Sequence, residues 1–218
     1  MITDRDVEIY KFINRYGKSY VEVLGKTFFN NVQVARNRIN KLAKQGFISY
    51  WNTNLMKPRR ALVLTEETKE FLTETFDLKI KSAKLNVSTI NHNVMEQIVD
   101  FHIQKLGNVE RTTVFTHQKI LHHIPDLLLN HEQGKIFFEI ELTKKSYKRY
   151  VEIFEKMKRD NVIQVVYVVK NETVLKSFSA NFPKWEKLRF ITIDTLVFNL
   201  KNGKKLGALS QEEIAKLI

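Results

Sequence analysis

The chain has 218 residues, of which 43% are hydrophobic and only 3 are Pro and 7 are Gly, a composition that excludes a disordered or fibrous protein. Cysteine is absent, which rules out disulfides and thiolate-bound zinc, and no apolar run approaches the roughly 20 residues that span a bilayer. The formal net charge of +12 favours a polyanionic partner, for which nucleic acid is the usual candidate.

The N-terminal part of the chain is predicted to begin with two helices. Thr3 and Asp6 form a plausible capping box, in which each side chain satisfies a backbone N–H, before a helix over residues 4–16. Ser19 and Glu22 have the same spacing and predict a second capping box, which would open a short second helix.

A third helix is predicted to follow Asn30 or Asn31, either of which can serve as its N-cap, and to run to Gln45. An apolar stripe along it predicts one face directed to the core. The other faces are basic and rich in amides, and they carry Gln33, Arg36, Asn37, Asn40, Lys41 and Lys44.

A β-hairpin is predicted next, with strands over residues 47–51 and 61–64 around a polar tip over residues 52–60. The basic residues of this tip are Lys57, Arg59 and Arg60. Three helices and a hairpin, in this order, are typical of a winged helix-turn-helix domain.

The distribution of charge favours DNA binding by this domain. Between Lys18 and Arg60 there are nine Lys or Arg residues and a single acid, Glu22. A helix fits the major groove, where Arg, Asn and Gln read base edges, while Lys and Arg on the hairpin tip would contact phosphates or the minor groove. The alternative is a domain that mediates protein contacts alone.

A further helix is predicted to start at Thr65, and residues 76–90 are interpreted as a connector. We therefore expect a winged helix-turn-helix domain over residues 1–78 and a second domain over residues 79–218. The second domain is predicted to alternate helices and strands around a mixed sheet, so the whole chain is expected to be α+β. Its predicted helices are 91–106, 144–159 and 171–181, and its predicted strands are 110–116, 124–130, 135–142, 162–169 and 188–193.

Three carboxylates are predicted to converge within the second domain. Glu139 and Glu141 alternate along one strand and so share a face, and the preceding strand brings Asp126 alongside through a short turn. Close carboxylates repel one another, and a hard cation such as Mg²⁺ or Mn²⁺ would offset that repulsion and activate a phosphate for hydrolysis. The alternative is a solvated edge strand with scattered acids.

The pair Pro125-Asp126, followed after twelve residues by Glu139-Ile140-Glu141, resembles the PD-(D/E)xK nuclease signature. Glu141 stands where that signature usually has lysine. Some restriction endonucleases of this fold have Glu-x-Glu there, and Lys144 and Lys145 follow closely enough to reach back.

A narrower resemblance, which covers most of the chain, is to the replication–relaxation family, similar to plasmid mobilisation proteins and relaxases. It rests on Glu110-Arg111, on the string His-Ile-Pro-Asp that ends at Asp126, and on Phe-Glu-Ile-Glu-Leu-Thr-Lys-Lys-Ser that ends at Ser146. The resemblance implies a winged helix before a restriction-endonuclease-like α/β core. It also implies that Asp126, Glu139 and Glu141 bind metal and act in catalysis with Lys145 as the matched lysine.

Histidines and tyrosines near these motifs leave alternatives open. His122 and His123 are interpreted as phosphate contacts or polar edge residues, and a zinc site that adds His117 is disfavoured without cysteine. Tyr147 and Tyr150 are interpreted as packing residues, and a covalent tyrosine mechanism stays open.

The leading hypothesis is a Mg²⁺- or Mn²⁺-dependent DNA endonuclease, a site-directed nickase or relaxase acting in plasmid replication, mobilisation or transfer. The alternatives are a non-catalytic DNA-binding regulator or relaxosome accessory protein, and the nuclease subunit of a transposition or restriction system. Expected partners are double-stranded DNA and other relaxosome or replication proteins, with homodimerisation left open and no membrane partner. Met1 is followed by Ile2, Thr3 and Asp4 and not by a basic segment and an apolar core, so we expect no secretory signal and a cytoplasmic location.

Overall fold

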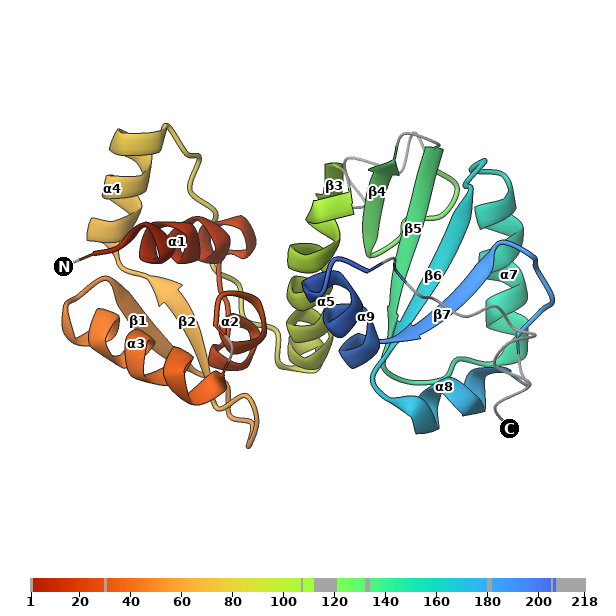
Figure 1. The fold of residues 1–218 in the computed structure, drawn as a ribbon, viewed down its shortest axis with the longest axis horizontal. Coiled ribbons are helices and arrows are strands. Elements are labelled where there is room, and N and C mark those ends of the chain that lie inside the picture. The colour runs from red at the N-terminus through yellow and green to blue at the C-terminus, as the bar shows by residue number, and fades with distance from the viewer. Residues whose placement is uncertain are drawn as a thin grey trace. The chain divides into compact units, whose positions relative to one another are not determined.

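The part of the chain that the structure describes has a mixed α+β fold with two β-sheets (Figure 1). The computed structural model describes residues 2–29, 31–106, 108–111, 121–131, 134–179, 182–204 and 206. It divides into two compact units, residues 1–98 and 99–218. The boundary predicted between residues 78 and 79 falls within the first of these units. The limits of the two domains stay a prediction.

The first unit has the predicted succession of three helices and a hairpin. Its elements are α1 (Asp4–Tyr16), α2 (Val21–Thr27), α3 (Val32–Lys44), β1 (Ile48–Asn52), β2 (Arg60–Leu64), α4 (Glu66–Phe76) and the 3-10 turn η1 (Val87–Thr89). Strands β1 and β2 pair antiparallel, with Ile48 opposite Leu64. Ser19 adds an isolated antiparallel bridge to Leu62 on the other edge of β2.

The capping box predicted at the start of α1 is confirmed. The side chain of Thr3 accepts from the backbone N–H of Asp6, and Asp6 accepts from the backbone N–H of Thr3 at 2.7 Å. Arg38 on α3 also donates to the Asp6 carboxylate, with its Nε at 2.8 Å. Asp6 therefore both starts α1 and ties it to α3.

The stability of the first unit should depend on pH through Asp6. Burial alone would raise the pKa of this carboxyl, but the hydrogen bonds from Arg38 and Thr3 outweigh it and hold the pKa below its ordinary value. A lowered pKa contributes stability that is present above pH 4 and lost as the pH falls through the folded-state pKa. We expect Asp6→Asn to lower the free energy of unfolding by about 1–2 kcal/mol at pH 7. In chemical denaturation this deficit should shrink below about pH 4, and the exposed Asp4→Asn should show neither effect.

The second predicted capping box is wrong. The N-cap of α2 is Tyr20, whose side chain makes no capping hydrogen bond. Ser19 instead donates its hydroxyl to Oε1 of Gln97 at 2.8 Å, and Gln97 donates to the backbone carbonyl of Lys18 at 3.2 Å. A buried tertiary partner thus takes the side chain that the local pattern assigned to the helix end.

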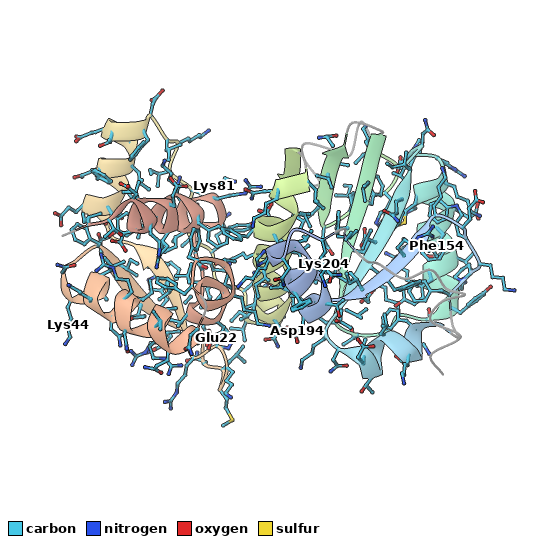
Figure 2. The ribbon with its side chains drawn as sticks, in the orientation of Figure 1. Glu22, Lys44, Lys81, Phe154, Asp194 and Lys204 are labelled. Carbon is cyan, nitrogen blue, oxygen red and sulfur yellow. The ribbon has the colours of Figure 1, made fainter. Side chains whose placement is uncertain are left out.

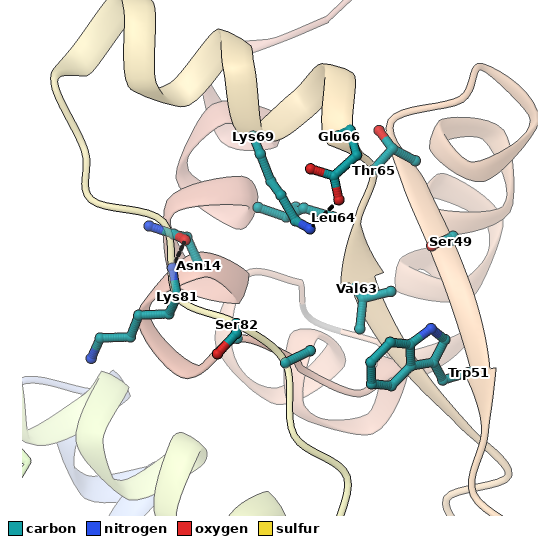
Figure 3. A pocket seen from close by; sticks show the side chains of 12 residues that line it. Asn14, Ser49, Trp51, Val63, Leu64, Thr65, Glu66, Lys69, Lys81 and Ser82 are labelled. Atoms are coloured by element: carbon teal, nitrogen blue, oxygen red, sulfur yellow. Dashed lines mark hydrogen bonds and ion pairs between the residues drawn. The ribbon is translucent and has the colours of Figure 1, made fainter.

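The connector after α4 has no regular structure up to residue 86, yet it is fixed to the first unit. Asn14 donates to the carbonyl of Lys79 at 3.1 Å and accepts from the backbone N–H of Lys81 at 3.0 Å (Figure 3). Gly17 ends α1 with a φ of +74°, and a Cβ there would lie 2.6 Å from the carbonyl oxygen of Ser82. Glycine is thus required both for the left-handed turn and for the close approach of the connector.

The second unit is built on a five-stranded mixed sheet in the order β3-β4-β5-β6-β7. Strand β4 pairs antiparallel with both β3 and β5, whereas β6 pairs parallel with both β5 and β7. The elements from the end of the first unit onward are α5 (Ile90–Ile103), η2 (Gln104–Leu106), β3 (Asn108–Arg111), β4 (Leu127–His131), β5 (Gly134–Glu141), α7 (Tyr147–Lys158), β6 (Gln164–Val169), α8 (Glu172–Ser179), β7 (Leu188–Thr192) and α9 (Ile193–Lys201).

Most of the predicted elements of this unit are found, with shifted ends. The first predicted strand, 110–116, is present as β3, and its residues 112–116 lie outside the described part of the chain. Helix α9, which directly follows the last strand, is not among the helices predicted from the sequence. Thr192 ends β7 and caps α9, its side chain accepting from the N–H of Thr195 at 3.2 Å.

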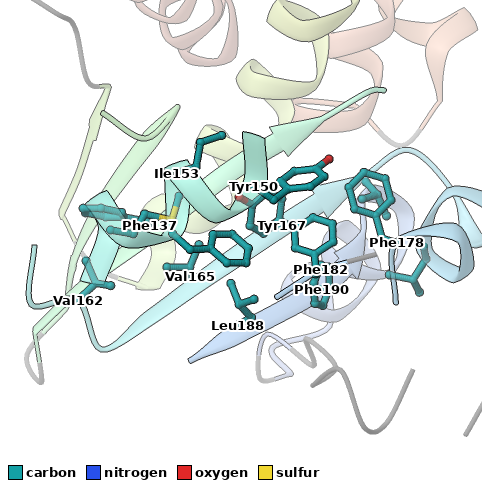
Figure 4. Close-up of a cluster of buried hydrophobic side chains, with 14 of the residues drawn as sticks. Phe137, Tyr150, Ile153, Val162, Val165, Tyr167, Phe178, Phe182, Leu188 and Phe190 are labelled. Atoms are coloured by element: carbon teal, nitrogen blue, oxygen red, sulfur yellow. The ribbon is translucent and has the colours of Figure 1, made fainter. Parts of the chain in front are cut away.

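An aromatic core lies between α7, α8 and one face of the sheet (Figure 4). Tyr150, Phe154, Tyr167 and Phe182 are buried within it, and the rings of Tyr150 and Phe182 stack with centroids 4.0 Å apart. Phe137 of β5 belongs to this core, so the alternation of β5 places Glu139 and Glu141 on the same, α7-covered face.

Among the helices that the structure describes, none combines the length and apolar character needed to cross a membrane.

Candidate functional site

The exposed face of α3 carries all six of the residues predicted to contact DNA there. Gln33, Arg36, Asn37, Asn40, Lys41 and Lys44 are exposed, while Ala35, Ile39 and Leu42 on the opposite side are buried. Asn31 is the N-cap, and its side chain accepts from the N–H of Gln33 at 2.6 Å. Figure 2 labels Lys44 near the C-terminal end of this helix.

Hydrogen bonds between neighbouring side chains hold part of this face in place. Arg36 donates to Oε1 of Gln33 at 3.0 Å, and Gln33 donates to Oδ1 of Asn37 at 3.0 Å. These pairs are three and four residues apart, so they lie along one strip of the helix surface. A strip of amides and guanidinium groups is suited to contacts with base edges and phosphates.

Residues of α2, of α3 and of the hairpin near its tip line a small pocket of about 150 Å³. Its lining residues are Val21, Glu22, Arg36, Asn40, Tyr50, Arg59 and Arg60. The hydroxyl of Tyr50 donates to Oδ1 of Asn40 at 2.7 Å, and the Arg60 guanidinium lies over the Tyr50 ring, 5.3 Å from its centroid. The structure thus brings together four of the nine residues predicted to bind DNA. Lys57, also exposed, is not among the lining residues.

The predicted carboxylates lie at the adjoining ends of β4 and β5. Asp126 immediately precedes β4, and its Oδ2 accepts from the backbone N–H of Ile140 on β5 at 2.7 Å. Glu139 and Glu141 flank Ile140 and share the opposite face of that strand. The side chains of Glu139 and Glu141 are 14% and 6% exposed, so this is not a fully solvated edge.

The three carboxylates influence one another electrostatically. Burial raises the pKa of Glu139 to about 7, and the charge of Asp126 adds to this rise against the lowering effect of His123. Burial likewise raises the pKa of Glu141, with Lys145 opposing and Asp126 adding to the rise. Asp126 therefore raises the pKa of both glutamates, while His123 and Lys145 act against it.

Lys145 reaches back to Glu141. Its ammonium forms an ion pair with Oε2 of Glu141, and it remains 41% exposed. The hydroxyl of Tyr150 accepts from the backbone N–H of Lys145 at 2.9 Å and lies 3.5 Å from Glu141 Oε2. The fold thus places a lysine beside the carboxylate that stands in the usual lysine position of the signature. Tyr150 is fully buried, whereas Tyr147 is 59% exposed.

His123, interpreted from the sequence as a phosphate contact or a polar edge residue, lies in the cluster beside Glu139. Its Nε2 lies 2.8 Å from Oε1 of Glu139. The turn that carries it is held by Asp160, whose fully buried carboxylate accepts from the backbone N–H groups of His122 and His123 at 2.6 and 2.8 Å. His123 lies three residues before Asp126 in the sequence. This short spacing is the sequence signal from which its place in the cluster could be predicted. His117 lies outside the described residues.

The donor chemistry of the cluster fits a hard divalent cation. Asp126 and Glu139 offer carboxylate oxygens, which Mg²⁺ and Mn²⁺ prefer, and their mutual repulsion favours an added positive charge. Over the described part of the chain, however, no three His, Asp or Glu side chains are grouped as a metal would need. Glu139 is held by His123 and Glu141 by Lys145, so a cation would have to displace one of these contacts.

Replacing Glu139 by glutamine should stabilise the second unit at alkaline pH. A raised carboxyl pKa means that ionisation costs folding free energy as the pH rises from about 4.5 to about 7. Glutamine removes that cost and keeps an oxygen that can accept from His123. We expect Glu139→Gln to raise the free energy of unfolding by about 1–2 kcal/mol at pH 8 and by less at pH 5. Chemical denaturation at both pH values tests this, with the exposed Glu152→Gln as the control.

A second pocket lies apart from both groups of predicted residues. It has a volume of about 370 Å³ and is formed by the hairpin, α4 and the connector of the first unit (Figure 3). Trp51 and Val63 form part of its wall, and Lys69, which lines it, is paired with Glu66 at 2.6 Å. None of the residues predicted from the sequence for DNA or metal binding lines it.

Comparisons with known proteins add no relative to this picture. A scan against protein-family models finds no match to this chain. A search of curated proteins and a search of solved structures likewise find no match. The function must therefore be argued from the two groups of residues themselves.

Proposed function

We propose that this protein binds double-stranded DNA through its first unit and cleaves a phosphodiester bond with the carboxylate cluster of its second unit. The observation that carries the proposal is the grouping of Asp126, Glu139, Glu141 and Lys145 near the adjoining ends of β4 and β5, with the side chains of both glutamates largely shielded from water. The resemblance to the replication–relaxation family implies roles for the same four residues.

DNA binding by the first unit is supported by shape and by charge. The order of three helices and a hairpin is that of a winged helix, which would place α3 in the major groove and the hairpin beside the backbone. The six exposed side chains of α3 would face base edges and phosphates there. Lys57, Arg59 and Arg60 of the hairpin are exposed and would contact phosphates or the minor groove.

In the proposed cleavage site, Asp126 and Glu139 would hold a Mg²⁺ or Mn²⁺ ion. Such an ion, when bound, polarises the phosphoryl group and lowers the pKa of a bound water. Glu141 would act as a further ligand or as a general base, since burial raises its pKa in the direction that makes a carboxylate a better base. Lys145, which is partly exposed beside Glu141, would stabilise negative charge on the phosphate.

The alternative is a DNA-binding regulator without catalysis on the same fold. The hydrogen bonds that occupy Glu139 and Glu141 favour it, because these carboxylates have partners without a metal. A protein that only binds DNA gains nothing, however, from acids with raised pKa values near a polyanion. We therefore place the nuclease first, acting as a site-directed nickase of a plasmid or other mobile element.

A plasmid assay tests the proposal. The protein is incubated with supercoiled plasmid that carries the DNA flanking its own gene, with Mg²⁺, with Mn²⁺ or with a chelator. We expect open circles with either metal and none with the chelator, and loss of this activity in Asp126→Ala. Retained plasmid binding without nicking under all metal conditions would replace the nuclease by the regulator.

A further inference from the structure

The small pocket between α2, α3 and the hairpin has a composition suited to one particular chemical group. Three of its seven lining residues are arginines, Arg36, Arg59 and Arg60, and a single acid, Glu22, faces them. Its net charge is therefore +2. Its volume of about 150 Å³ is about half of the roughly 300 Å³ at which small-molecule sites begin, so it is too small for a whole nucleotide.

The arginines of this pocket are available for a ligand. No ion pair joins Arg36, Arg59 or Arg60 to an acid within the described ranges of the chain. Arg60 is instead packed over the Tyr50 ring, and Arg36 donates one N–H group to Gln33. Each guanidinium has five N–H donors in a planar fork that matches the oxygens of a phosphate.

The side-chain amide of Asn40 is also oriented to donate a hydrogen bond into the pocket. Its Oδ1 accepts the hydroxyl proton of Tyr50 at 2.7 Å, and this contact fixes which end of the amide is occupied. The Nδ2 group, which only donates, is then left to the pocket. Tyr50 belongs to the hairpin and Asn40 to α3, so this hydrogen bond also joins the two elements that form the walls.

The geometry points to this pocket as the binding site of one phosphate group, a phosphate of the DNA backbone that fixes the position of α3 relative to the hairpin on the duplex. The inference rests on the proposed DNA binding and deepens it. Phosphate contacts set the register of a protein on DNA without reading sequence. If α3 and the hairpin bind the same phosphate, the DNA contacts of α3 and those of the hairpin depend on each other.

Arg59→Gln and Lys79→Gln test the inference as a matched pair. Both residues are exposed in the first unit and both changes remove one positive charge, but only Arg59 lines the pocket. Inorganic phosphate is titrated into the full-length protein by calorimetry. We expect one phosphate bound per chain, weakened about tenfold by Arg59→Gln, the loss of a charge-assisted hydrogen bond. Lys79→Gln should leave this binding unchanged, and a thermal unfolding curve checks that both variants fold.

Duplex DNA supplies the second arm. The slope of log Kd against log salt should fall by about one in Arg59→Gln, since one phosphate contact contributes about 0.9 to it. Equal affinity for duplexes with 5′-phosphate and 5′-hydroxyl ends identifies a backbone phosphate, whereas a preference for the 5′-phosphate that Arg59→Gln removes would overturn that assignment in favour of a DNA end.

The arms separate the inference from the proposed function. Duplex binding with a salt slope that Arg59→Gln does not change, together with unchanged phosphate binding, would overturn the pocket and leave DNA binding intact. Phosphate binding that Arg59→Gln weakens, without any duplex binding at low salt, would support the pocket as a phosphate site and contradict the proposed DNA binding.

Discussion

Asp126→Asn should reduce metal-dependent DNA cleavage by about three orders of magnitude and leave DNA affinity within a factor of two. Asparagine keeps an oxygen that can accept the backbone N–H of Ile140, so the contact between the start of β4 and the end of β5 should persist. It removes the charge, however, that would hold the cation. Several kcal/mol of transition-state stabilisation then disappear, which corresponds to a loss of about 10³ in rate.

The matched control for this prediction is Glu152→Gln on α7, an exposed acid of the same unit that pairs with Arg149 at 3.2 Å. Single-turnover cleavage and fluorescence anisotropy with the same duplex separate chemistry from binding. Cleavage by Asp126→Asn at more than about a tenth of the wild-type rate would remove Asp126 from the catalytic group. A parallel loss of binding would instead indicate that the substitution disturbs the fold.

Phe154→Ala should lower the free energy of unfolding of the second unit by about 3–5 kcal/mol, because it empties a fully packed aromatic site. Phe154 is 1% exposed. Its ring lies 5.6 Å from that of Phe182, 5.9 Å from that of Trp185 and 6.2 Å from that of Tyr167. Because α7 covers the face that carries the glutamates, cleavage should be lost together with stability.

Phe198→Ala on α9 is the control for this prediction, because the Phe198 side chain is 58% exposed and its removal should cost less than about 0.5 kcal/mol. Chemical denaturation measures both variants. If Phe154→Ala cost as little as Phe198→Ala, the aromatic cluster would not be the core that supports the site.

Local signals explain why some elements could be predicted from the sequence. The capping box of Thr3 and Asp6 involves residues three apart, so its geometry is contained in the sequence itself. The pairing of Asp126 with β5 followed in the same way from a short turn and the alternation of the strands. The approach of Lys145 to Glu141 is a contact between residues four apart.

Other features depend on distant residues and could not be predicted. Ser19 has the spacing of a capping residue, but its hydroxyl donates a hydrogen bond to Gln97, 78 positions further along the chain. His123 lies beside Glu139 because Asp160, 37 residues further along the chain, binds the turn that presents it. Such contacts require the fold to be formed first, and no local pattern encodes them.

Direct titration with Mn²⁺ tests whether the carboxylate cluster binds a divalent cation. Electron paramagnetic resonance counts free and bound Mn²⁺ on the full-length protein, on Asp126→Asn and on Glu152→Gln. The proposed site predicts saturable Mn²⁺ binding at the cluster in the wild type and in Glu152→Gln, and its loss in Asp126→Asn. Two results would contradict a metal site at Asp126, Glu139 and Glu141. One is that none of the three proteins binds Mn²⁺ when duplex DNA is present, and the other is that all three bind it equally.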